Sequence, residues 1–283
     1  MTSSMPAPAE IVRPFADLPA WIRHFRAAEI PVLRETVEAI EALRANEDAT
    51  DANSIGEMIG GDPLMTLKIL IYAAAHRSRR VETSVETIIA ALVMMGIPPF
   101  FRAFSDQVAV EDRLGHDEHA LAGVNRVLRR AHRGARFALA FAIHRTDPNA
   151  ATIHAAALLH EFAELLLWCH APRLALAIEK IQRDDVTVRS SAAQLQVLNI
   201  DLATLQEALI SSWQLPRLLS ETGREPQAGN TGARTVALAA RLARHTANGW
   251  DNAAVPDDIT EISALLNLSV AATLHLAMGI DAE

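Results

Sequence analysis

The nine residues Asp62–Leu70 have the sequence DPLMTLKIL and mark the start of a helix. Aspartate caps helices because its carboxylate accepts hydrogen bonds from the N–H groups of the first turn, and proline at the first helical position loses no useful N–H group. Apolar residues follow at Leu64, Leu67 and Leu70, which is the spacing of a helix. We therefore expect a helix that begins at this aspartate and is largely buried.

The same helical period continues on both sides of this stretch. Upstream, Ser54 and Glu57 have the spacing of a capping box, in which two side chains bond the free N–H groups of a helix start. Downstream, Thr83 and Glu86 repeat that spacing, and the apolar helix that they open is expected to end at Gly96. Convincing runs of alternating apolar residues, which are typical of strands, are not found. The sequence therefore predicts an all-α fold.

Proline-rich and charged segments divide the chain into three parts. Residues 1–29 are expected to form an N-terminal arm, and its prolines lie in the segment 1–20, which is expected to be extended. The charged segment Val108–Ala120 is the candidate boundary between a helical subdomain at 30–110 and a second one at 120–283. The predicted architecture is a multi-helix bundle of two packed helical subdomains. In the second of them, Ala150–Trp168 is expected to form one core helix.

The composition is that of a globular protein from a reducing compartment. Hydrophobic residues make up 50% of the 283 residues and charged residues 21%, which excludes a disordered chain. The net charge of −8 argues against general nucleic-acid binding. The single cysteine, Cys169, excludes an intramolecular disulfide framework. No secretory signal is visible, and the longest nearly uncharged stretch, Thr87–Phe101, is too short for a membrane span. We expect a cytoplasmic protein without membrane contact.

Three stretches, taken together, carry a resemblance to a known family. The first is 62–70, followed by the helix that ends in Met-Gly at 95–96. The second is 155–163, AAALLHEFA, and the third is 198–216, which begins with LNIDL and ends with WQLP. In order and spacing they resemble the HDOD family of bacterial signalling modules, which are relatives of the HD-domain phosphohydrolases. The resemblance covers about residues 30–244 and implies a helical fold of HDOD type.

The second and third stretches depart from the family pattern at the metal ligands of the HD-domain enzymes. His160 matches the histidine of the HD signature, but Glu161 replaces its aspartate and Leu202 replaces a later histidine. The family's later His-His pair would fall near Arg224-Glu225, where this sequence has no histidine. A catalytic metal needs at least about three convergent protein ligands, and only His132 could join the first two. The resemblance therefore implies vestigial HD-like positions at His132, His160 and Glu161, with no catalytic residue, no metal and no cofactor.

Other histidines and the cysteine are weaker candidates for chemistry. His160 has apolar neighbours, so a core histidine that is hydrogen-bonded within the bundle is the alternative to a ligand. His160 and Glu164 are spaced i,i+4, but the zincin pattern needs a second histidine at the latter position. The segment His116–His119 contains a literal His-Asp pair and is interpreted as a solvated linker. Cys169 is expected to be a buried structural thiol.

Five arginines gather on the long helix that is expected over residues 120–144. They form a broad basic face and comprise Arg126, Arg129, Arg130, Arg133 and Arg136. Guanidinium groups make forked hydrogen bonds to phosphate and carboxylate oxygens, which predicts a site for a nucleotide, a phosphorylated partner or an acidic protein surface. The alternative is a solvated face with local ion pairs. A second cluster at Arg77, Arg79 and Arg80 would favour the anion site if the two clusters meet in space.

Two functions from different classes follow from these observations. The favoured one, which the resemblance implies, is a non-enzymatic regulatory module that acts through an unknown signalling protein. The alternative is a divergent metal-dependent phosphohydrolase of nucleotides or cyclic dinucleotides, with His132, His160 and Glu161 as metal ligands. A nucleotide sensor that uses only the arginine face is a third hypothesis. The apolar Trp21 and Phe25 of the arm either pack onto the bundle or dock onto a partner, and a homodimer stays open.

Overall fold

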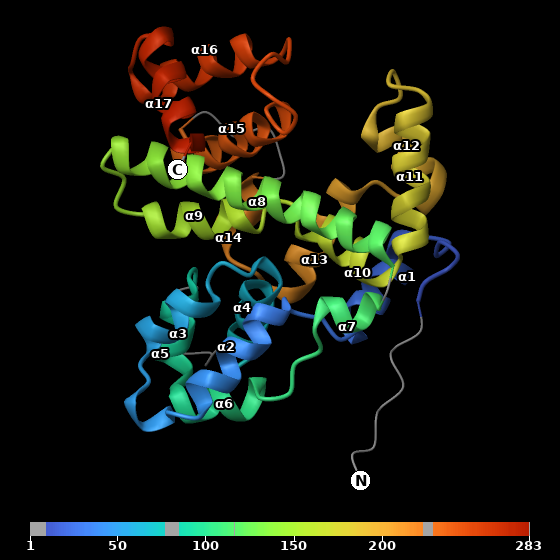
Figure 1. Cartoon of the computed structure of the whole chain (residues 1–283), viewed down its shortest axis with the longest axis vertical. Helices are drawn as coiled ribbons and strands as arrows, with labels where there is room; N and C mark the ends of the chain where they lie inside the picture. Colours follow the sequence, from blue (N-terminus) through green and yellow to red (C-terminus); the bar gives the residue numbers. More distant parts are fainter. Residues whose placement is uncertain (1–9, 77–84, 116, 223–228, 283) are drawn as a thin grey trace.

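The structure, a computed structural model, describes residues 10–76, 85–115, 117–222 and 229–282. Within these ranges every regular element is a helix, and strand-like pairing is confined to one isolated parallel bridge. The predicted all-α fold is confirmed. The helices form two groups, each around its own cluster of buried apolar side chains (Figure 1).

The smaller group lies in the lower part of Figure 1, drawn in blue to teal. Its core combines the isoleucines Ile55 and Ile59 with a cluster of phenylalanines that includes Phe100 and Phe104. A 3-10 turn at Glu47–Ala49 connects the first two of its helices. The helices of this group are α2 (Arg34–Arg44), α3 (Ala52–Ile59), α4 (Pro63–Ala75), α5 (Ile88–Met95) and α6 (Ile97–Phe104).

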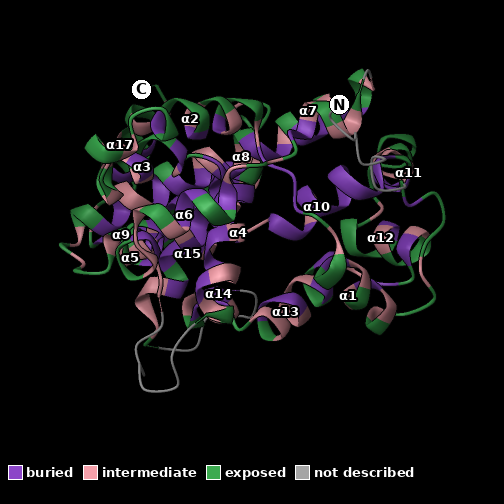
Figure 2. Ribbon diagram, turned by 90° about the horizontal axis from the view of Figure 1, so that it is seen from below, coloured by how far each residue is buried: buried purple, intermediate pink, exposed green. Residues whose placement is uncertain are grey.

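The larger group is built around α8 (Glu118–His144), against which several later helices pack. Figure 2 shows how deeply this core is buried, most plainly along α10, where only Glu164 is not fully buried. The other helices of this group are α1 (Leu18–Ala27), α7 (Val110–Leu114), α9 (Ala150–Leu158), α10 (Phe162–His170), α11 (Pro172–Asp184), α12 (Ser190–Leu198), α13 (Leu202–Trp213), α14 (Arg217–Thr222), α15 (Thr231–His245), α16 (Val255–Leu266) and α17 (Val270–Ala282).

Helix α4 joins the two groups because it is buried on opposite faces. Leu64 and Leu67 belong to the larger apolar cluster, whereas Met65 and Ile69 belong to the smaller one. The prediction that Asp62 caps this helix is confirmed, since its Oδ1 accepts hydrogen bonds from the backbone N–H groups of residues 64 and 65 at 2.8 and 3.1 Å. The capped start therefore sets the position of a helix that both cores share.

Two predicted helix starts differ from the structure, while one predicted end is confirmed. Ser54 does not cap α3, because the helix begins two residues earlier and Asp51 accepts the hydrogen bond from the backbone N–H of Ser54 at 2.7 Å. The N-cap of α5 is Thr87, four residues after the predicted Thr83, which lies outside the described residues. The same helix ends at Gly96, whose φ of +85° lies in the left-handed region that favours glycine.

The expected single helix over 150–168 is divided into α9 and α10. A turn at Leu159–Glu161 separates them. It contains His160 and Glu161, the HD-like pair that matches the HD signature, and is called the HD-like turn below. The stretch from Ala150 to His170 as a whole is long and apolar enough to cross a membrane by length and composition, but 56% of its most apolar window is buried inside the protein. This burial is what a core element of a helical bundle requires.

The N-terminal arm packs onto the larger group, which decides between the two interpretations of its apolar residues. Trp21 and Phe25 on α1 are 0% and 2% exposed. The indole N–H of Trp21 donates to the carbonyl oxygen of Leu198 at 3.1 Å. The backbone N–H of Ile11 donates to the carbonyl oxygen of His170 at 2.8 Å. The described part of the arm is thus an integral part of the fold. The expected extended segment ends earlier than predicted, because α1 begins at Leu18 with Asp17 as its N-cap.

Candidate functional site

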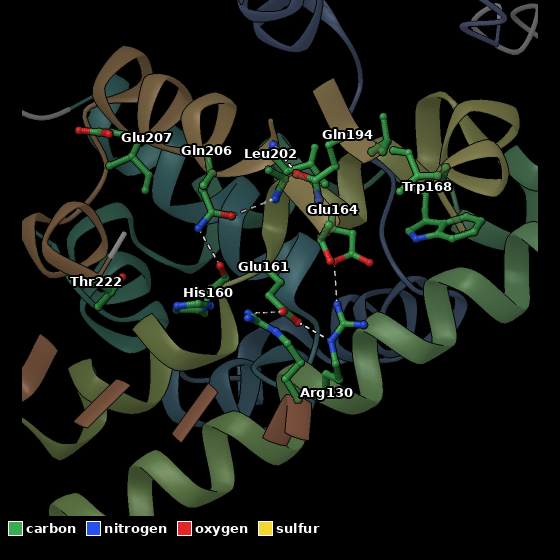
Figure 3. A pocket seen from close by; sticks show the side chains of 18 of the residues that line it. Arg130, His160, Glu161, Glu164, Trp168, Gln194, Leu202, Gln206, Glu207 and Thr222 are labelled. Atoms are coloured by element: carbon green, nitrogen blue, oxygen red, sulfur yellow. Dashed lines mark hydrogen bonds and ion pairs between the residues drawn. The ribbon is translucent and has the colours of Figure 1, made fainter. Parts of the chain in front are cut away.

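A pocket of about 490 Å³ opens beside the turn between α9 and α10 (Figure 3). Side chains from α8, α10, α11, α12, α13, α14 and α15 contribute to its lining. Its volume falls within the range of about 300–1,000 Å³ that is usual for small-molecule sites. The charged and polar groups that define its floor are Arg130, His160, Glu161, Glu164, Gln206 and Arg244.

The backbone of the HD-like turn is held by Gln206 of α13. Its amide nitrogen donates to the carbonyl oxygen of His160 at 2.7 Å, and its amide oxygen accepts from the backbone N–H of Ala163 at 3.3 Å (Figure 3). One side chain therefore satisfies a carbonyl and an N–H group at the break between two helices, where backbone groups lack helical partners. The turn is fixed by a residue of another helix rather than by its own sequence.

The imidazole of His160 lies beside the pocket with an unused nitrogen. Its Nδ1 atom is buried and has no hydrogen-bond partner among the described residues. Burial lowers the pKa of His160, and the positive charges of Arg244 and Arg130 act in the same direction against the opposing charge of Glu161. The ring is therefore neutral at pH 7, with one nitrogen able to donate and one able to accept.

A network of two guanidinium and two carboxylate groups forms the charged part of the floor. Arg130 binds Glu161 at 2.8 Å through Nε and Glu164 at 2.7 Å through a terminal nitrogen. Arg244 reaches the second oxygen of Glu161 at 3.1 Å. Both oxygens of Glu161 are thus occupied by arginines, as Figure 3 shows for Arg130. The acidic residue of the HD-like pair is a partner of guanidinium groups.

The two carboxylates of this network have opposite pKa shifts. Burial alone would raise the pKa of Glu161, but the charges of Arg130 and Arg244 outweigh it and bring the pKa below its ordinary value. Burial raises the pKa of Glu164 and outweighs the opposing charge of Arg130, while the negative charge of Glu161 adds to the rise. Glu161 is thus paired with two arginines, whereas Glu164 is paired with Arg130 alone and its burial is less fully compensated.

The predicted arginine face is divided among several carboxylates. Arg126 pairs with Glu179 of α11, and Arg130 belongs to the pocket network. Arg133 makes two hydrogen bonds to Asp281, at 2.7 and 2.9 Å, and Arg136 lies 4.0 Å from the same carboxylate. Arg129 is exposed and forms no ion pair within the described parts of the chain. The second cluster, Arg77, Arg79 and Arg80, lies outside the described residues.

The ion pair of Asp281 gives a pH prediction for the free energy of unfolding. Burial would raise the pKa of Asp281, but hydrogen bonds and charge from Arg133 bring it below its ordinary value of 3.8. The folded state thus holds the charged form more strongly, so its contribution is complete above pH 3.8 and disappears as the pH falls through the folded pKa. Asp281→Asn is expected to lower the free energy of unfolding by about 2 kcal/mol at pH 7.

Urea unfolding between pH 7 and pH 3 tests this expectation, with the exposed Asp257→Asn of α16 as the control. The difference between wild type and Asp281→Asn should shrink below about pH 4, where the wild-type carboxylate begins to gain its proton. A difference that stays constant down to pH 3 would contradict the assignment of the effect to this ion pair.

His132 lies apart from the other HD-like positions. Its Nε2 hydrogen-bonds to the carbonyl oxygen of Gly61, at 2.6 Å, and the residue does not line the pocket. Leu202 lines the pocket, while Asp201 beside it caps α13 by accepting from the backbone N–H of Thr204 at 2.8 Å. Within the described ranges, no three His, Cys, Asp or Glu side chains form a group that could hold a metal ion. The structure thus brings together two of the three vestigial positions.

The structure also shows the surroundings of two weaker candidates from the sequence, the literal His-Asp pair and Cys169. Asp117 of the literal His-Asp pair caps α8 through the backbone N–H of Ala120, while His116 lies outside the described residues. Cys169 is 2% exposed, and burial raises the pKa of its thiol to about 12 against the opposing charge of Arg113. The thiolate is the reactive form of cysteine, so this thiol is protected from alkylation in the folded protein.

Alkylation with iodoacetamide at pH 8 tests the burial of Cys169. We expect the folded protein to react at least about 100-fold more slowly than the protein in 6 M guanidinium chloride, because both access and thiolate fraction are reduced. Mass spectrometry of quenched samples follows the reaction. Rapid labelling of the folded protein would mean that α10 leaves the core far more often than its packing indicates.

Comparisons with known proteins agree with the arrangement of these elements. The family model for the HDOD domain matches residues 30–227, well over half of the 283-residue chain. The chain belongs to the HDOD domain family. A search of curated proteins gave no match. The matched residues include the HD-like turn and every residue of the pocket lining except Arg244.

Two solved structures are similar to this HDOD protein along most of their length. The MmoQ response regulator from Methylococcus capsulatus is 18% identical, with a TM-score of 0.65 over 89% of this chain and 98% of that one. A virulence factor from Campylobacter jejuni is 17% identical, with a TM-score of 0.63 over 92% of this chain and 97% of that one. At these identities the likeness concerns the fold.

Three residues of this pocket were not anticipated from the sequence. Gln206 and Arg244 reach the HD-like turn from helices that begin more than 40 residues later, and no spacing rule connects them to it. Glu164 was noted only for its i,i+4 relation to His160. The one available signal was the acidic pair Glu161 and Glu164, at the N-cap and in the first turn of an otherwise apolar helix. Acidic residues in such a buried position need cationic partners.

Proposed function

We propose that this HDOD protein is a non-enzymatic module of bacterial, cytoplasmic signal transduction that acts through a partner protein. The observation that carries the proposal is the state of Glu161, whose two carboxylate oxygens are bound by Arg130 and Arg244. This is the position where the HD-domain phosphohydrolases, to which the sequence is related, have an acidic metal ligand. A divalent cation would displace these guanidinium groups and then experience their positive charge at short range.

The geometry of the other HD-like positions supports the same proposal. His132 is bound to the backbone at Gly61, outside the pocket, and Leu202 offers no atom that can ligate a metal. Metal-assisted hydrolysis requires several ligands around one point and an open coordination position for water. The pocket instead contains a fixed ion-pair network, which is suited to binding and to holding helices in a defined arrangement.

A combined metal and hydrolysis assay tests the non-enzymatic proposal. The protein is purified without chelator and without a His tag, and bound transition metals are measured by elemental mass spectrometry. Hydrolysis of bis-p-nitrophenyl phosphate and of cyclic dinucleotides is measured with added Mg²⁺, Mn²⁺ and Fe²⁺. We expect little bound metal and no hydrolysis above that of Glu161→Ala.

The opposite outcome would support the divergent phosphohydrolase. It would be about one equivalent of metal per chain, the stoichiometry of a single-metal site, together with hydrolysis that disappears in His160→Ala. The role as a module has its own positive test, which is in-cell crosslinking followed by mass spectrometry. A partner identified in this way must bind the purified protein in a saturable manner, and the absence of any saturable partner would contradict the module.

A further inference from the structure

The pocket beside the HD-like turn combines an apolar wall with a charged floor. Leu167, Trp168, Ile178 and Ile210 contribute apolar surface, and the charged groups lie around Arg130. Small-molecule sites are typically apolar concave surfaces with a few polar groups that fix the orientation of the ligand. The pocket has the size and the composition of such a site. The unused hydrogen-bond donors and acceptors of its polar groups therefore indicate what it could bind.

One positive and one negative group on the floor have unused hydrogen-bonding capacity. The side chain of Arg244 is 54% exposed, and toward the described residues it uses a single terminal nitrogen, which contacts Glu161 at 3.1 Å. Glu164 uses only Oε2, which binds Arg130 at 2.7 Å, and its Oε1 accepts no hydrogen bond from any described residue. The pocket therefore offers a guanidinium group for an anion and a carboxylate oxygen for a cation.

A third polar group is an independent indication of a ligand. The Nδ1 atom of His160 is buried at the pocket without a partner among the described residues. A buried polar atom without a hydrogen bond costs about 1–3 kcal/mol, so native proteins seldom leave one unsatisfied. A bound molecule that hydrogen-bonds this nitrogen would remove that cost.

The balance of charges selects against ligands of a single sign. A dianionic phosphate at Arg244 would face the carboxylates of Glu161 and Glu164 on the floor, with Glu179 and Glu207 also in the lining. A polycation at Glu164 would meet the guanidinium group of Arg130. Like charges at short range in a partly desolvated pocket cost several kcal/mol. The lining thus favours a molecule that carries one charge of each sign.

We propose that the pocket binds a free amino acid, with its carboxylate at Arg244, its ammonium group at Glu164 and its side chain against the apolar wall. Because Nδ1 of His160 is buried in the ligand-free structure, its hydrogen bond to the ligand requires the imidazole to turn toward the pocket. The inference rests on the proposed function in one respect, because the bound amino acid would be the signal that the module passes to its partner. Forked contacts to a carboxylate are the usual role of an arginine in such sites.

Isothermal titration calorimetry and thermal unfolding with the twenty standard amino acids test the proposal. Each amino acid that binds is compared with its N-acetyl derivative, which lacks the ammonium charge, and with its amide, which lacks the carboxylate. We expect at least one amino acid to bind and to raise the melting temperature, and both blocked derivatives to bind at least about tenfold more weakly. Equal binding of a blocked derivative, or binding of GMP or AMP but no amino acid, would overturn the proposal.

Two variants assign the charged contacts, and a third is their control. Arg244→Gln and Glu164→Gln are each expected to weaken amino-acid binding at least about tenfold. Arg241→Gln, on the same helix as Arg244 but paired with Asp258 and Glu261 outside the pocket, should bind as the wild type does. Unchanged binding in both pocket variants would overturn the assignment. The metal and hydrolysis assay is independent of these measurements, so failure of the ligand and failure of the non-enzymatic role give different results.

Discussion

Replacing Asp62 by alanine is expected to lower the free energy of unfolding by about 4 kcal/mol. The carboxylate is 2% exposed and serves two helices at once. Its Oδ1 accepts from the backbone of α4, and its Oδ2 accepts from the backbone N–H of Leu33 and the hydroxyl of Thr36, both at 2.8 Å. Alanine would leave these donors unsatisfied in the region where the two apolar cores meet.

Two further variants separate burial from capping. Asp51→Ala removes the exposed N-cap of α3, a similar cap without the second set of bonds, and should cost about 1 kcal/mol. Asp62→Asn keeps one acceptor oxygen but directs an amide group at donors, so we expect an intermediate loss. Urea unfolding gives all three values. A loss for Asp62→Ala no larger than that for Asp51→Ala would show that the contacts with α2 contribute nothing.

Gly123→Ala is expected to lower the free energy of unfolding by about 3 kcal/mol, although alanine is the better helix former. Gly123 lies within α8 directly beneath the indole of Trp168 on α10. An added Cβ would lie 2.5 Å from both Cε3 and Cη2 of that ring. The indole is 2% exposed and cannot move without disturbing the core between the two helices. The clash therefore outweighs the gain in helix propensity.

Gly279→Ala on α17 is the matched control. No atom lies within 4 Å of the Cβ that this substitution would add, so the variant should be as stable as the wild type or more stable by up to about 1 kcal/mol. Chemical unfolding of both variants under the same conditions gives the comparison. If Gly123→Ala were also neutral, the close approach of α8 and α10 at this point would be wrong.

The parts of the fold that were predicted correctly depend on local chemistry. Asp62 and the proline after it define a helix start through groups only a few residues apart, and Gly96 ends a helix through its own backbone conformation. The turn that divides 150–170 was missed because its residues include no glycine or proline. It is held by Gln206, 46 residues from His160, and a contact at that separation leaves no local pattern.

The candidate site shows the same limit for charged groups. Helical spacing correctly suggests that the five arginines share one helix, but it does not reveal their partners. Arg130 pairs with carboxylates 31 and 34 residues away, and Arg133 pairs with one 148 residues away. Whether a basic face is free to bind an anion depends on these distant partners. The pocket appears only when seven separate helices are assembled around the HD-like turn.

The docking of α1 has a consequence for the order of events during synthesis. The Trp21 indole donates to the carbonyl oxygen of Leu198, which is translated 177 residues later. At about 5–20 residues per second, the ribosome needs roughly 10–35 s to produce the acceptor. During that interval Trp21 and Phe25 have no binding surface of their own and are available to chaperones. Translation speed between the codons of Trp21 and Leu198 should therefore influence the yield of folded protein, even though α1 is among the first helices to emerge.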